Sequence, residues 1–198
     1  KRFGAKFSSD HGKLPIIIQG TDHSKPIRYF ENKGSAQCKS AVMFAALNTS
    51  GETIIKAKKS RDHSELLFKH LKLPIKIIKN DKYDIIKLLG KRKIPGLNYK
   101  IPSDISSAAF FITLTALSKN SCLKIMNVNI NPSRIGILYI LELMGVKISK
   151  SNIKNYKGEK IADLIIKGTN KIKPINCPIK FNSSAIDEFL LIFLIAAK

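Results

Sequence analysis

Three stretches of the chain begin with small hydroxylated residues and continue as almost uninterrupted apolar segments. They open at Ser35, Ser106 and Ser183 and lead into residues 38–47, 109–117 and 186–197. Apolar runs of this length favour helices over strands. A helix that is apolar all round has to be buried all round, so we expect three central helices inside the core.

The segments that follow these helices also repeat. Alternating residues at 51–57 and 122–128 predict half-buried strands. A second helix then starts after a Ser-Arg pair, at Ser60-Arg61 and again at Ser133-Arg134. Short strands are expected next at 75–78 and 146–148, and before the serine turns at 27–30, 99–101 and 179–181. Any α/β protein alternates helices and strands, but the matched order favours duplication of a β-α-β-α-β-β unit.

A domain boundary is expected near Pro102. A basic stretch with Pro and Gly at 91–96 precedes it, and a new repeat opens directly after it. We therefore predict that residues 1–102 belong to one domain and residues 103–198 to another. The last apolar run has no C-terminal cap, so we expect the sequence to be incomplete.

The formal net charge of +21 raises the possibility of a nucleic-acid partner. Lysines are spread along the whole chain, however, and only five residues are arginine. Reading of bases and phosphates usually relies on the bidentate geometry of arginine. No specific nucleic-acid partner is therefore expected, although a basic binding module stays as an alternative.

Neither a metal site nor a membrane partner is expected. Cys38, Cys122 and Cys177 are widely spaced and form no CxxC pair, which favours a reducing compartment. The longest apolar run is well short of the ~20 residues that span a bilayer. We predict a cytoplasmic protein.

The serine turns favour an anionic ligand. Each would present the free N–H groups and the positive dipole end of a helix, which are suited to phosphate or carboxylate. The sequence reads SAQCKSA at residues 35–41, SRDHSE at 60–65, PSDISSAAFF at 102–111 and NVNINPSRIG at 127–136. These segments resemble the SAQxKSA, SRDHTE, PGDxSSAAFF and NVGxNPTRxG motifs of the enolpyruvylshikimate-phosphate synthase family.

Shorter matches follow in the same order, at residues 158–159 (GE), 162–164 (ADL) and 186–188 (IDE). The chain departs from the family pattern at Ser103 and Asn129, where glycine is usual, and at Leu190, where proline is usual. The resemblance extends over nearly the whole chain.

The resemblance implies a transferase that moves the enolpyruvyl group of phosphoenolpyruvate to the 5-hydroxyl of shikimate 3-phosphate. The family works by addition and elimination, without a metal or an organic cofactor. Its fold consists of two domains built from β-α-β-α-β-β units with buried central helices, and this chain would be incomplete at both ends. The implied full-length enzyme is a monomer.

The resemblance also implies site residues. Ser35, Ala36, Gln37 and Arg61 would bind shikimate 3-phosphate, and Gln37 would also contact phosphoenolpyruvate. Asp187 would contact the reacting hydroxyl and accept its proton. Physical chemistry offers simpler roles too, because Ser35 can be an N-cap, Arg61 can pair with Asp62 or Glu65, and Asp187 can belong to a capping box. Arg134 has the place of Arg61 in the second repeat, but no role in the site is predicted for it.

Other basic residues on which the family's catalysis depends have no counterpart in these 198 residues. We therefore expect negligible activity from the chain alone. A related enolpyruvyl transferase acting on UDP-N-acetylglucosamine shares the fold and is the nearest alternative, but the SAQ and SRDH motifs favour shikimate 3-phosphate.

Overall fold

The computed structural model describes residues 1–198 and divides into two compact units, Lys1–Leu97 and Asn98–Lys198. Each unit has a hydrophobic core of its own. The boundary predicted near Pro102 separates domains of the full-length protein. The division of this chain into two units does not test it, so it stays a prediction.

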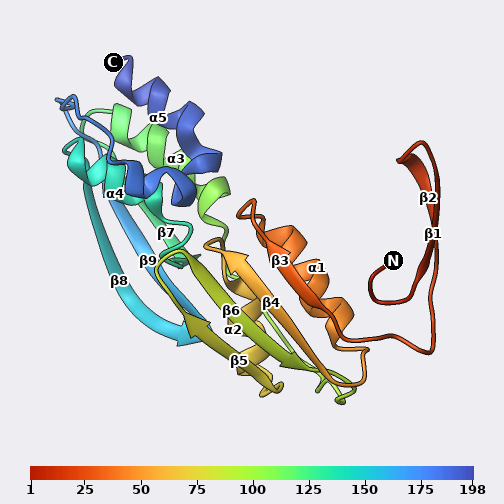
Figure 1. Cartoon of the computed structure of the whole chain (residues 1–198). Helices are drawn as coiled ribbons and strands as arrows, with labels where there is room; N and C mark the ends of the chain where they lie inside the picture. Colours follow the sequence, from red (N-terminus) through yellow and green to blue (C-terminus); the bar gives the residue numbers. More distant parts are fainter. The chain divides into compact units, whose positions relative to one another are not determined.

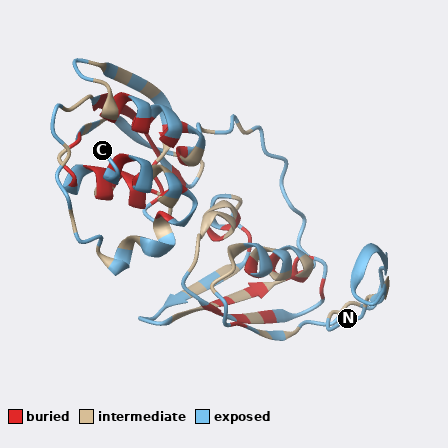
Figure 2. Cartoon of the chain, turned by 90° about the horizontal axis from the view of Figure 1, so that it is seen from above, coloured by how far each residue is buried: buried red, intermediate tan, exposed pale blue.

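The first unit is a four-stranded sheet with two helices. Its strands are β3 (Arg28–Glu31), β4 (Glu52–Lys58), β5 (Ile75–Lys79) and β6 (Tyr83–Leu89), in the order β3-β4-β6-β5. Strand β3 is parallel to β4, and the other pairs are antiparallel. Helices α1 (Ala36–Ala46) and α2 (His63–His70) cover one face of the sheet (Figures 1 and 2). A hairpin of β1 (Lys6–Asp10) and β2 (Lys13–Gln19) precedes them.

The alternation in β4 explains which face of this sheet is covered. Thr53, Ile55 and Ala57 are buried as predicted. Ile86 of β6 lies opposite Ile55 in the antiparallel register and is also buried. Ile55, Ala57 and Ile86 join Met43 of α1 in one hydrophobic core, so burial on this face holds the helices on the sheet.

The second unit is a three-stranded antiparallel sheet with helices on one side (Figure 1). Its elements are α3 (Ile105–Leu117), β7 (Cys122–Asn129), α4 (Gly136–Leu143), β8 (Lys147–Tyr156), β9 (Glu159–Lys167) and α5 (Phe189–Ala196), with 3₁₀ turns η1 (Ile179–Ser184) and η2 (Ile186–Glu188) before α5. The strand order is β7-β9-β8. Helices α3 and α4 contact the sheet, and α5 packs against both of them.

The two sheets confirm the repeat. In the first unit β3 is parallel to β4, which is antiparallel to β6, which is antiparallel to β5. In the second, β7 is antiparallel to β9 and β9 to β8. Ser103 forms an isolated parallel bridge with Val128 of β7, in the place that β3 has beside β4. The predicted α/β fold class, with repeated β-α-β-α-β-β units, is therefore confirmed.

Two of the predicted short strands are wrong. Residues 99–101 form no strand, because the following Pro102 has no N–H to donate and only Ser103 reaches the edge of β7. Residues 179–181 begin the 3₁₀ turn η1 instead. Its hydrogen bonds are local, since Phe181 N–H donates to the carbonyl of Pro178 at 3.0 Å, and the ring of Phe181 stacks on Tyr139.

The third apolar helix begins later than predicted. Helix α5 starts at Phe189 with Glu188 as its N-cap, while Ser183 and Ser184 lie in η1. The hydroxyl of Ser184 donates to the carbonyl of Phe181 at 3.1 Å, so it serves the turn and not the helix. Asp187 consequently lies in η2, just before α5.

The central helices are buried on one side only. Ala109, Ile112 and Ala116 of α3 lie in the core of the second unit, whereas Phe110, Phe111 and Leu114 are more than 60% exposed. Helix α5 shows the same division. The expectation of burial all round fails because the sheet and neighbouring helices of one unit cover a single side. No helix combines the length and hydropathy needed to cross a membrane.

Candidate functional site

The first candidate group lies at the start of α1. Glu31 is buried and its carboxylate accepts hydrogen bonds from the N–H groups of Lys33 and Gly34, at 2.9 and 2.8 Å. Gly34 has φ +77°, a left-handed conformation that glycine adopts without strain. This turn delivers Ser35 as the N-cap of α1, where its hydroxyl accepts from Cys38 N–H at 3.2 Å. Ala36 is partly buried and Gln37 is exposed.

A buried lysine links α1 to the start of α2. The Lys39 ammonium forms an ion pair of 2.6 Å with Glu65, and the side chains are 3% and 5% exposed. The same ammonium donates to the main-chain carbonyl of Arg61 at 2.8 Å. The hydroxyls of Ser40 and Ser64 add a second link of 2.7 Å between the helices. Burial raises the pKa of the Glu65 carboxyl, although the charge of Lys39 opposes that rise.

These contacts bring together the predicted site residues of the first unit. Arg61 lies in the loop just before α2, whose N-cap is Asp62, and is partly buried. The contact of Lys39 with Arg61 places this loop beside the first turns of α1. The expected pairing with Glu65 is instead made by Lys39, and the carboxylate of Asp62 lies 3.9 Å from Lys79.

The second unit has its charged group around Arg134. The guanidinium donates to Ser106 Oγ at 2.6 Å and to Asp104 at 3.1 Å, and the same nitrogen lies 4.0 Å from a carboxylate oxygen of Asp187. Ser106 also donates to the buried Glu188. Asp104 is the N-cap of α3. Burial opposes its ionisation, but the hydrogen bond from Ser107 and the charge of Arg134 together lower the pKa of Asp104.

A glycine makes room for the segment that carries Asp187. A Cβ on Gly136 would lie 2.5 Å from Ser184 Oγ and 2.7 Å from the Ser184 carbonyl carbon. Only a residue without a side chain therefore lets this turn rest on the start of α4. This close approach, two residues after Arg134, explains how Asp187 comes near the guanidinium.

The acidic residues of the GE and ADL motifs have structural contacts. Glu159 accepts from the side-chain amide of Asn131 at 3.2 Å, and Asn131 in turn accepts from the N–H of Ser133 in the turn before α4. Asp163 is 6% exposed and accepts from Asn127 N–H at 3.0 Å. Asn152 and Lys124 also contact its carboxylate, and together these hydrogen bonds lower the pKa of Asp163 to about 2.

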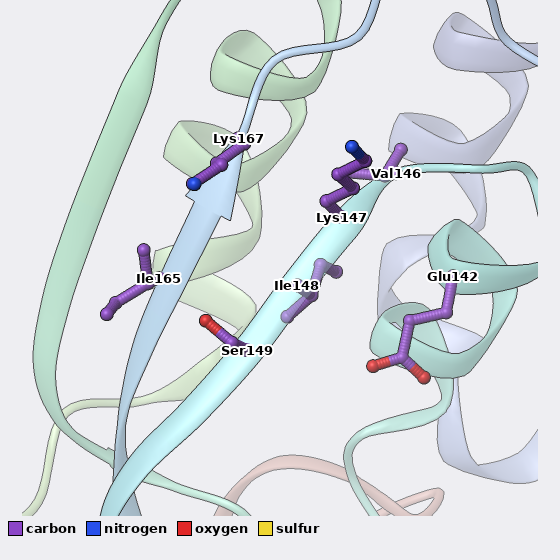
Figure 3. Close-up of a pocket in the computed structure, with 7 residues that line it drawn as sticks. All are labelled: Glu142, Val146, Lys147, Ile148, Ser149, Ile165 and Lys167. Carbon is purple, nitrogen blue, oxygen red and sulfur yellow. The ribbon is translucent and has the colours of Figure 1, made fainter.

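A cavity of about 390 Å³ elsewhere in the second unit is lined by residues of α4, β8 and β9 (Figure 3). Glu142 lines it from α4, Ile148 and Ser149 from β8, and Lys167 from the end of β9. No predicted site residue lines this cavity. The candidate functional residues therefore form two separate groups, one at the helix starts of each unit.

Sequence reasoning missed the partners that fix these groups. The sequence does single out Lys39, because it is the one charged residue in an otherwise uncharged helix. Arg134 was signalled by its place in the repeat, but its contacts with Asp104 and Ser106 join residues 30 and 28 positions apart. No local pattern predicts such pairs.

Comparisons with known proteins agree with these motifs. A sequence model described as EPSP synthase (3-phosphoshikimate 1-carboxyvinyltransferase) matches residues 1–198. The chain is 39% identical over 197 residues to the 3-phosphoshikimate 1-carboxyvinyltransferase of Ruthia magnifica, and 38% identical over 197 residues to that of Legionella pneumophila strain Corby. Each match covers 99% of this chain and 44% of the relative, so the chain spans less than half of their length.

Solved structures show the same relationship. The EPSP synthase of Acinetobacter baumannii matches with a TM-score of 0.85 and 35% identity, over 98% of this chain and 44% of that one. The enolpyruvyl transferase NikO from Streptomyces tendae matches with a TM-score of 0.69 and 14% identity, over 99% and 47%, which shows a shared fold alone. Because the family's sequence model covers every residue and the repeated fold agrees with it, the chain belongs to the EPSP synthase family.

Proposed function

We propose that this chain is part of an enzyme that transfers the enolpyruvyl group of phosphoenolpyruvate to the 5-hydroxyl of shikimate 3-phosphate. The match of the family to residues 1–198 carries this proposal. In the addition step the hydroxyl oxygen bonds to the phosphate-bearing carbon of phosphoenolpyruvate, and a proton goes to the methylene carbon. Elimination then breaks the bond to phosphate and removes a proton from the resulting methyl group, which restores the double bond.

The start of α1 is the proposed site for shikimate 3-phosphate. Ser35 Oγ accepts from Cys38 N–H, which leaves the hydroxyl proton available for a phosphate oxygen. Capping and ligand binding are therefore compatible at Ser35. Ala36 would contribute a free main-chain N–H of the first turn. The exposed amide of Gln37 can both donate and accept, which suits contact with both substrates.

Arg61 is proposed to bind the same substrate through its guanidinium. This group matches the planar geometry of carboxylate and phosphate oxygens and can donate two parallel hydrogen bonds. The contact between its own carbonyl and Lys39 is made by the main chain and does not occupy the guanidinium.

Asp187 is proposed to accept the proton of the 5-hydroxyl. A base has to reach its proton directly, and the side chain of Asp187 is 45% exposed, so a ligand can reach the carboxylate. Arg134, itself held by Asp104 and Ser106, lies beside this carboxylate and restricts its orientation.

Replacement of Asp187 tests the proposal. In the full-length enzyme we expect Asp187→Asn to lower kcat by at least ~10²-fold, because the amide cannot accept the proton. Glu142→Gln, on the exposed face of α4, is the control and should leave kcat unchanged. Phosphate release and substrate affinity would be measured for both variants. Near-normal turnover of Asp187→Asn would reject the role.

The remaining expectations concern the protein as a whole. The 198-residue chain alone should release phosphate at a negligible rate, because neutralising the substrate phosphates and carboxylates requires several cationic groups. We also propose a cytoplasmic, monomeric full-length enzyme that needs no cofactor. Despite the charge of +21, its binding to nucleic acid should be weak and non-specific.

A further inference from the structure

Helix α1 contains a single charged residue, Lys39, and its side chain is almost completely buried. The partner of Lys39 is Glu65 on α2, at 2.6 Å. Removing two charges from water has a large cost, which their attraction recovers only when the geometry is good and the remaining atoms are hydrogen-bonded. One oxygen of Glu65 is buried without a hydrogen-bond partner. A contribution to the stability of the fold is therefore a weak explanation for the presence of this ion pair.

The second unit shows that the repeat packs without such a pair. The structure aligns the two helices by their N-caps, Ser35 of α1 and Asp104 of α3, so the predicted correspondence of Ser35 with Ser106 is shifted by two residues. Lys39 and Ala108 each lie four residues after the cap. Glu65 lies four residues after Arg61, and the same offset from Arg134 gives Leu138. Ala108 and Leu138 are both buried in the core of the second unit. Apolar residues thus serve the packing of α3 and α4 at the two equivalent positions.

The Lys39 ammonium supplies one contact that an apolar residue cannot supply. It donates to the carbonyl of Arg61 at 2.8 Å. The hydrogen bonds of α2 begin with Leu66 N–H and the carbonyl of Asp62, so the carbonyl of Arg61 lies outside that ladder. Lys39 therefore fixes the peptide unit that carries the Arg61 side chain, and Glu65 fixes Lys39.

We propose that the buried pair of Lys39 and Glu65 is a positioning device that holds Arg61 in the geometry needed to bind shikimate 3-phosphate. The inference rests on the proposed function, because it takes Arg61 as a ligand of that substrate. Neither Lys39 nor Glu65 touches the substrate, and both act through the main chain of Arg61. A displacement of about 1 Å in a positioned group can change activity by as much as ~10²-fold.

The test uses a full-length enzyme in which both residues of the ion pair are replaced by apolar residues, Lys39→Met/Glu65→Leu. The second unit likewise has apolar residues at the equivalent positions. The double variant should fold with a melting temperature close to that of the unmodified enzyme, because a well-packed apolar pair can replace a buried ion pair. Its KM for shikimate 3-phosphate should rise roughly tenfold, while kcat at saturating substrate changes much less. A double variant that fails to fold, or one that folds and keeps the original KM, would overturn the proposal.

Arg61→Ala separates this inference from the proposed function. If Arg61→Ala weakens binding of shikimate 3-phosphate and the double variant does not, the positioning role is wrong while the assignment of Arg61 stands. If Arg61→Ala binds normally, the assignment itself fails, and the positioning role fails with it. Combining all three substitutions completes the test, because the double substitution should have no further effect on affinity once the Arg61 side chain is absent. Additive losses would contradict action through Arg61.

Discussion

The two Ser-Arg pairs occupy equivalent places in the repeat but are held in different ways. In the first unit the main-chain carbonyl of Arg61 is bound by the buried Lys39. In the second unit the Arg134 side chain itself donates to Asp104 and Ser106 and lies near Asp187. Duplication has preserved the strand connectivity, while the contacts of the arginines have diverged.

This difference separates two uses of one position. The contacts of Arg134 use its guanidinium to join three segments of the second unit. The contact of Arg61 with Lys39 uses the backbone, which is compatible with a guanidinium that binds a ligand. The same residue type is thus part of the scaffold in one unit and a proposed substrate ligand in the other.

The largest effect on stability is expected from Lys39→Met alone. This substitution leaves the buried Glu65 without its partner, so the free energy of unfolding should fall by about 3–5 kcal/mol. Urea denaturation of the chain, followed by circular dichroism, measures the loss. Lys79→Met is the matched control, because Lys79 is 70% exposed and its pair with Asp62 should contribute at most about 1 kcal/mol. Equal losses in the two variants would show that burial of Lys39 has no such consequence.

A smaller effect is expected when each arginine is replaced by methionine. Arg134→Met removes charge-assisted hydrogen bonds to Asp104 and Ser106 and should lower the free energy of unfolding by about 1.5–3 kcal/mol. Arg61→Met keeps the main-chain hydrogen bond that Lys39 makes, so we expect it to cause a smaller loss than Arg134→Met. The same denaturation experiment compares the two variants. A greater loss of unfolding free energy for Arg61→Met would contradict the assignment of Arg134 to the scaffold and of Arg61 to substrate binding.

The smallest effect is expected at Asp163 and should depend on pH. The N–H of Asn127, then Asn152 and Lys124, lower the pKa of this carboxyl from 3.8 to about 2 in the folded protein. Because the folded pKa is the lower one, the stabilisation is present above pH 3.8 and disappears as the pH falls through about 2. Urea denaturation at several pH values should therefore show Asp163→Asn less stable at pH 7, with a difference that narrows in acid.

Asp81→Asn, in the exposed turn between β5 and β6, controls for the loss of one negative charge. Because Asp81 is exposed, this substitution should leave the free energy of unfolding at pH 7 nearly unchanged. If the unfolding free energies of the unmodified chain and Asp163→Asn differ by a constant amount down to pH 2, stabilisation by the ionised Asp163 carboxylate is contradicted.

Local patterns predicted the elements whose partners lie close in sequence. Thr53, Ile55 and Ala57 alternate, and they are buried on one face of β4 as expected. Ser35 was expected at the start of a helix and is its N-cap. The family was also predicted correctly, because several motifs occur in the family's order and spacing.

Two predictions failed in the segment before α5, where apolar residues and serines form a 3₁₀ turn. Residues 179–181 are apolar enough for a strand, but local hydrogen bonds and the ring of Tyr139 make them a 3₁₀ turn. The serines at 183 and 184 precede an apolar run, yet α5 begins only at Phe189. In both cases contacts within the folded unit outweighed local propensity.

The sequence by itself determined the repeat, the fold class and the family, because hydrophobic period and short motifs are local properties of the chain. Only the tertiary structure decided that Lys39 holds the carbonyl of Arg61 and that Arg134 lies beside Asp187. Such pairs depend on how helices and turns pack, and a buried charge gives no sign in the sequence of which distant group satisfies it.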